Sequence, residues 1–177
     1  MSAVSEASDD AIRQARPLGS TLDPLTIPKY VTPLVIPPVM KHAGTANDYD
    51  IAVRQFKQQI LPGGIWNTLN GRADAFPPTT VWSYGSVQFP GTAAEGGSFN
   101  YPAFTIESKW RKPIRVKWVN DLVDATGNYL PHLLPVDQTL HWANPPRDCE
   151  DPAKDRDCRG TNAEPYEGPV PMIVHVH

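Results

Sequence analysis

Hydrophobic and polar residues alternate along several short segments of this chain, as expected for strands that bury one face. The clearest segment is 114–118, where three apolar residues alternate with two cations. Residues 79–85 and 100–107 are also predicted strands, and 48–60 is another whose phase shifts at Phe56, which suggests a bulge. Because almost no segment shows helical periodicity, the pattern predicts an all-β fold built as a sandwich or barrel.

Proline enrichment supports the same fold class. The chain has 20 prolines in 177 residues, against about 9 at typical usage. Five of them lie in 22–40, which therefore cannot form a helix or a central strand. Its apolar side chains predict that this segment runs extended along the surface of something larger. Residues 122–170 are a second, unusually long irregular section, which indicates a functional role or packing on a partner.

The last seven residues, 171–177, are apolar, β-branched and alternating, and predict a strand. Side chains two apart on a strand share a face, so His175 and His177 should point the same way, with Cα atoms about 6–7 Å apart. Neutral imidazoles at that spacing suit one transition metal or two neighbouring ones. The alternatives are a polar strand edge or the end of a purification tag, although tags usually carry a longer histidine run.

Charge and terminal sequence exclude several classes of protein. A net charge of −3 gives no reason to expect a nucleic-acid partner, and we identify no basic aromatic patch. No apolar run is long enough to span a membrane, so none is expected as a partner. Residues 1–17 lack the apolar core of a signal peptide, which predicts a cytoplasmic protein or export by another route. Cys149 and Cys158 lie in a charged, turn-rich loop, where a disulfide and two thiols are both compatible with the sequence.

Five blocks in a fixed order carry a family resemblance. They are residues 81–85, 102–107, 114–122, 134–143 and 174–177. Together they resemble the first cupredoxin domain of multicopper oxidases, nearest to bacterial spore-coat laccases and phenoxazinone synthase-like oxidases. The resemblance implies a cupredoxin-like Greek-key β-sandwich over 41–177, preceded by an arm over 1–40. It also makes a spore-coat location an alternative to the cytoplasm.

The same resemblance implies copper as the cofactor. By position, His175 resembles the type 2 copper ligand and His177 a type 3 ligand of the trinuclear cluster. The type 1 copper and the other ligands are absent, so the expected partners are the remaining cupredoxin domains, as a second chain. The implied reaction oxidises phenols or aromatic amines and reduces dioxygen to water, and the chain alone is not expected to be active. The rival hypotheses are a metal-free, non-catalytic β-sandwich interaction module and a lone His-x-His zinc or copper carrier.

The remaining candidate side chains are assigned structural roles. Asp137 is expected to tie its loop through hydrogen bonds to backbone, as Asp does in turns. His141 is expected to form a structural hydrogen bond, and His42 and His132 to be solvated. The five tryptophans are expected in the core or at domain interfaces: Trp66, Trp82, Trp110, Trp118 and Trp142.

Overall fold

The computed structural model describes residues 22–175 except 45–46, 70, 74–75, 141–142 and 145–163. The chain divides into two compact units. Unit 1 comprises Met1–Val35 and Gln59–Thr79, and unit 2 comprises Ile36–Gln58 and Thr80–His177. In the part of the chain that the structure describes, no helix is long and apolar enough to cross a membrane.

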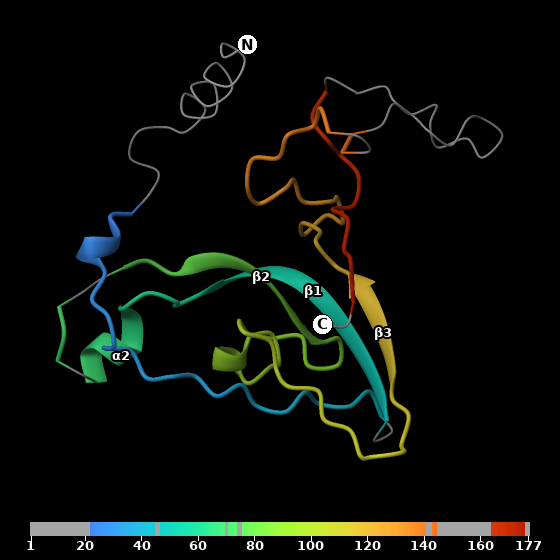
Figure 1. The fold of residues 1–177 in the computed structure, drawn as a ribbon, viewed down its shortest axis with the longest axis horizontal. Coiled ribbons are helices and arrows are strands. Elements are labelled where there is room, and N and C mark those ends of the chain that lie inside the picture. Colours follow the sequence, from blue (N-terminus) through green and yellow to red (C-terminus); the bar gives the residue numbers. More distant parts are fainter. Residues whose placement is uncertain are drawn as a thin grey trace, which may run out of the picture. The chain divides into compact units, whose positions relative to one another are not determined.

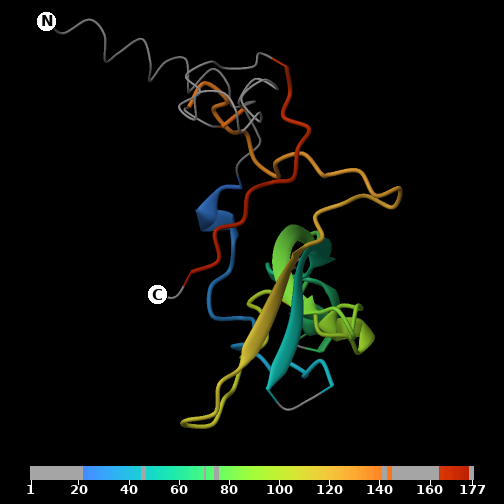
Figure 2. The same ribbon diagram turned by 90° about the vertical axis from the view of Figure 1, so that its right-hand side faces the viewer.

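Unit 2 is built on a three-stranded sheet with the order β2-β1-β3 (Figure 1). Strand β1 is Asp48–Gln58, β2 is Thr79–Ser86 and β3 is Arg115–Asn120. Strands β1 and β3 are parallel, in register from Asp48 opposite Arg115 to Val53 opposite Asn120, and they run side by side in Figures 1 and 2. This open mixed sheet, with little helix, confirms the predicted all-β class and is consistent with a cupredoxin-like fold.

Strand β2 runs antiparallel to β1. The amide of Val87, directly after β2, donates to the carbonyl of Asp50 near the start of β1, and the Trp82 indole donates to Gln55 near its end. Three predicted strands are therefore confirmed. The phase shift expected in 48–60 is also present: residues before Arg54 bury their odd positions, and after it the even positions are the more buried ones.

Two predicted strands are wrong in the described structure. Residues 100–107 contribute one isolated bridge, in which Thr105 pairs with Val39, because Pro102 has no N–H to give a ladder. Residues 171–175 form no strand in the described structure. Alternation shows which face a segment would bury, but a strand also needs a partner for its backbone.

Two hydrophobic clusters form the core of unit 2. The first contains Met40, Tyr49, Ile51 and Phe104. The second contains Val53, Leu122 and Val170, with Trp82 and Met172 packed against it. The central strand β1 supplies residues to both clusters, Tyr49 and Ile51 to the first and Val53 to the second.

Short helices complete the two units. In unit 1, α2 spans Gly64–Leu69 and the 3-10 helix η1 spans Pro24–Thr26. In unit 2, the 3-10 helix η2 spans Ala93–Glu95 and begins with a capping box between Thr92 and Glu95. Unit 1 leaves the apolar side chains of its arm in solvent: Leu25 is 89% exposed and Leu34 is 90% exposed.

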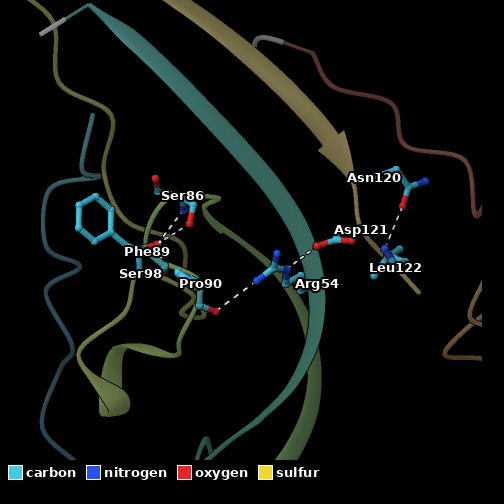
Figure 3. Close-up of polar contacts among 8 residues, drawn as sticks. All are labelled: Arg54, Ser86, Phe89, Pro90, Ser98, Asn120, Asp121 and Leu122. Atoms are coloured by element: carbon cyan, nitrogen blue, oxygen red, sulfur yellow. Dashed lines mark hydrogen bonds and ion pairs between the residues drawn. The ribbon is translucent and has the colours of Figure 1, made fainter. Parts of the chain in front are cut away.

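Arg54 connects three parts of unit 2 (Figure 3). Its Nε donates to the carboxylate of Asp121, directly after β3, and one terminal nitrogen donates to the carbonyl of Pro90 at 3.3 Å. Its guanidinium also lies over the ring of Phe99, 4.7 Å from the centroid. The last residue of β3, Asn120, and the two residues after it are thereby held against the central strand.

Candidate metal-ligating segment

The structure describes one of the two predicted metal ligands. His175 ends the described part of segment 164–175, and His177 lies outside the described residues. The segment is not a strand, and the predicted alternation is seen only as far as Ile173. Val170 is buried and Met172 is partly buried, whereas Ile173 is 84% exposed, Val174 is 43% exposed and His175 is exposed. A face shared by His175 and His177 stays a prediction.

Segment 164–175 is attached to the end of β3. The side-chain amide of Asn120 donates to the carbonyl oxygen of Val170 at 2.8 Å. The Val170 side chain packs with Val53 and Leu122, and Met172 covers the same cluster. One hydrogen bond and one apolar cluster thus fix the backbone three to five residues before His175.

Contacts within the segment fix its earlier residues. The Tyr166 hydroxyl donates to the carbonyl of Pro169 at 2.7 Å. The Tyr166 ring lies 5.5 Å from the ring of His132, and the Asn144 amide donates to the carbonyl of Glu164 at 2.6 Å. These contacts hold residues 164–169, which precede the predicted strand 171–177.

The ring of His175 is oriented by the backbone. Its Nδ1 lies 3.0 Å from the carbonyl oxygen of Ile173. A carbonyl can only accept, so this hydrogen bond requires the proton on Nδ1 and, in the neutral ring, assigns the lone pair to Nε2. Metal-binding histidines typically donate their second ring N–H to a carbonyl or carboxylate in this manner. The ring therefore fits a role as an Nε2 ligand to copper or another metal that accepts imidazole.

The described residues do not complete a metal site. Within them, no group of three or more His, Cys, Asp or Glu side chains is placed to hold an ion. A metal on His175 must therefore take its other ligands from residues outside that set or from another polypeptide.

Other predicted residues are placed as follows. Asp137 accepts from the Thr139 amide at 2.9 Å and the Thr139 hydroxyl at 2.6 Å, which confirms its turn role. These two bonds, led by the hydroxyl, lower the pKa of Asp137. His42 is exposed beside Tyr49, with ring centroids 4.8 Å apart, as expected for a solvated residue.

Several expectations fall outside the described structure or need correction. His141, Trp142 and both cysteines lie outside the described residues, as does the side chain of Trp66. Trp82 is partly buried at the second cluster, in agreement with a core role. Trp110, however, is 88% exposed, so a core position is wrong.

Sequence reasoning missed two polar features. Trp110 sits among exposed cations in a turn that sequence analysis did not single out. The signal was present in the sequence of 109–112, Lys-Trp-Arg-Lys, and was hidden by the net negative charge. The second feature is Asp124, whose pKa is lowered to about 2, chiefly by a hydrogen bond from the Thr126 hydroxyl and then by the Asn128 and Thr126 amides.

Comparisons with known proteins identify two curated relatives. The chain is 30% identical over 161 residues to a laccase from Haloferax volcanii, covering 86% of this chain and 20% of that protein. It is 28% identical over 123 residues to a laccase from Bacillus subtilis, covering 68% of this chain and 18% of that protein. No family model and no solved structure matches. The chain thus spans about a fifth of the length of the relatives it matches, and it is similar to part of proteins named laccase.

Proposed function

We propose that this chain is part of a laccase-like multicopper oxidase and supplies His175 and His177 as copper ligands. The observation that carries the proposal is the 30% identity to a laccase over 161 residues, which span 86% of this chain. The hydrogen bond between His175 Nδ1 and the Ile173 carbonyl adds support, because it prepares Nε2 as the ligand atom.

In this proposal the two histidines have different copper ions as neighbours. By resemblance, His175 binds the type 2 copper and His177 a type 3 copper of a trinuclear cluster. The other histidines and the type 1 copper belong to further cupredoxin domains, carried by the rest of the protein or by a second chain. Copper would supply the one-electron redox chemistry that couples oxidation of a phenol or aromatic amine to reduction of dioxygen to water.

The residues of this chain orient the ligands and hold them on the fold. The Ile173 carbonyl fixes the tautomer of His175, and Asn120 with Val170 fixes the segment to the end of β3. A ligand supported in this way loses less conformational freedom when it binds a metal. The sheet therefore acts as the scaffold from which the copper ligands project.

A metal-free interaction module is the second candidate function. It is favoured by the exposed apolar side chains of the arm, Leu25 and Leu34 among them. Contiguous apolar surface in water marks sites of protein association. An oxidase with further domains would use the same surface, so the arm alone does not separate the two candidates.

Copper content and oxygen consumption test the proposal in the complete protein from its native source. Copper is counted per protein by mass spectrometry of the metal, and oxygen uptake is followed with 2,6-dimethoxyphenol as the phenolic probe. We expect His175→Ala and His177→Ala each to lower copper-dependent oxygen uptake at least about 100-fold, since even residues behind the ligands contribute 10–100-fold. The matched control is His42→Ala, which removes an exposed histidine of the same unit.

The outcomes separate the two candidates. Retention of copper and activity in both ligand variants would remove the oxidase proposal for these residues. A wild-type protein that binds no added copper and elutes as a single, monodisperse species would favour the interaction module. Circular dichroism of each variant distinguishes loss of a ligand from loss of the fold.

A further inference from the structure

A basic turn projects beyond the start of β3. The Lys112 amide donates to the Lys109 carbonyl at 3.0 Å, which closes a four-residue β-turn. Arg111, its third residue, has a φ of +60°, the conformation that type II turns require there. Figures 1 and 2 both show this yellow segment extending past the strand ends of unit 2. We call residues 109–112 the basic turn.

The basic turn carries concentrated positive charge on a chain that is negative overall. Lys109, Arg111 and Lys112 are all exposed, and no described ion pair involves any of them. Arg115 and Lys117 extend the charge along β3 and are also exposed. They lie in register with aspartates of β1, which weaken their field. The three cations of the turn therefore concentrate positive charge at this end of unit 2.

Trp110 occupies the outer corner of the basic turn. It is 88% exposed, and no described aromatic ring packs against it. The second tryptophan nearby, Trp118, instead packs edge-on against Tyr84 with ring centroids 5.4 Å apart. A single large aromatic side chain thus stands exposed between cations in the turn.

We propose that the basic turn binds the surface of an anionic lipid bilayer, with Trp110 at the headgroup level and the flanking cations on the lipid phosphates. Tryptophan is enriched at membrane interfaces because its ring is apolar and its N–H is polar. Lysines and arginines next to such an anchor add electrostatic attraction to anionic lipids. Binding to a surface needs no membrane-spanning segment, so the sequence-based reason for excluding a membrane partner does not apply to it.

The aromatic content of the basic turn favours a bilayer over a nucleic acid. Single-stranded nucleic acids are bound by grooves in which several aromatic side chains stack on successive bases. Here only Trp110 is available, because Trp118 is already packed against Tyr84. One aromatic anchor flanked by cations suits the headgroup level of a bilayer. The inference does not depend on the copper chemistry proposed above.

Vesicle co-sedimentation of the complete protein tests the inference. The probes are vesicles of phosphatidylcholine alone and vesicles with about one third phosphatidylglycerol. We expect binding only to the anionic vesicles, and its loss at about 1 M salt, where the Debye length is about 3 Å. The double variant Arg111→Gly with Lys112→Ala should bind about 30-fold more weakly, at roughly fivefold per cation. Glycine suits the positive φ at Arg111, so this change leaves the turn unstrained.

Two matched controls keep the test specific. Lys29→Ala with Lys57→Ala removes two exposed cations elsewhere and changes the net charge equally. Tyr30→Ala removes a fully exposed aromatic residue of the arm, for comparison with Trp110→Ala. We expect both controls to bind as the wild type does, and Trp110→Ala to bind at least about tenfold more weakly.

Three results would overturn the inference. The first is a wild-type protein that does not sediment with anionic vesicles at low salt. The second is equal loss of binding in the two double variants, which would indicate a net-charge effect. The third is displacement from the vesicles by a single-stranded oligonucleotide at a lower concentration than by added anionic lipid, which would identify a nucleic acid as the occupant.

Discussion

The attachment of the histidine-bearing segment can be tested with one isosteric change, Asn120→Asp. The side-chain amide of Asn120 donates to the Val170 carbonyl at 2.8 Å, while its oxygen accepts from the Leu122 amide at 3.3 Å. Aspartate retains the acceptor and the volume but replaces the donor with a charged oxygen facing a carbonyl. The substitution therefore removes one bond between β3 and the segment without creating a cavity.

The expected cost follows from the contacts at Val170. Loss of the hydrogen bond leaves the carbonyl of a buried residue without its donor, at about 1–3 kcal/mol. Taking about 2 kcal/mol, the population in which the segment is detached should rise roughly 30-fold. The apolar cluster of Val53 and Leu122 remains, so the sheet itself should stay folded.

Limited proteolysis measures that population. Thermolysin cleaves before large apolar residues, and cleavage before Met172, which packs against the cluster of Val53, Leu122 and Val170, requires the segment to leave the end of β3. When opening and closing are fast, the cleavage rate follows the population of the open form. We expect roughly 30-fold faster cleavage in Asn120→Asp, with weaker copper retention. The control is Asn100→Asp, which breaks a similar amide-to-carbonyl bond, to Pro102, at an exposed site. Equal cleavage rates in the two variants would refute the reasoning.

Three further predictions concern the fold. Leu122→Ala should lower the free energy of unfolding, measured in urea, by about 2–5 kcal/mol, because Leu122 is only 2% exposed. Leu25→Ala, at an exposed position, should leave it almost unchanged, and equal effects of the two changes would contradict this prediction. Gly85→Ala should lower the free energy of unfolding by about 1–3 kcal/mol, since a Cβ at this position would lie 2.5 Å from the Phe99 ring. An unchanged unfolding midpoint would contradict this prediction. The Asp124 carboxyl should titrate near pH 2 when its chemical shift is followed by NMR. Because its pKa in the folded protein is lowered, the carboxylate stabilises the fold above pH 3.8, and this contribution is lost as the pH falls toward 2. A titration midpoint at the ordinary value would disprove the hydrogen-bonded turn.

The sequence predicted a strand correctly where an alternating side-chain pattern coincided with a neighbouring strand that could accept its backbone hydrogen bonds. Alternation located β1, β2 and β3, because each has a neighbouring strand to pair with. It failed at 100–107, where Pro102 interrupts pairing, and at 171–175, where no partner strand is present in the described structure. Helix α2 was missed because its six residues are too short to show a helical period.

The candidate site was predictable in part. The period of two agrees with the partly buried Met172 and the exposed Ile173, but Val174 is also exposed, at 43%, so the shared face of Ile173 and His175 stays a prediction. The sequence could not reveal that the Ile173 carbonyl orients the imidazole, since that contact depends on backbone geometry rather than on residue type. It also could not reveal the attachment of Val170 to Asn120, which joins residues 50 positions apart.

Anomalous diffraction at the copper edge from crystals of the complete, copper-loaded protein tests the central claim most directly. The account predicts a copper peak about 2 Å from Nε2 of His175, a distance typical of metal–imidazole bonds, with Nδ1 still donating to the Ile173 carbonyl and His177 bound to an adjacent copper. A His175 ring with no metal near it, in crystals that hold copper elsewhere, would contradict the account.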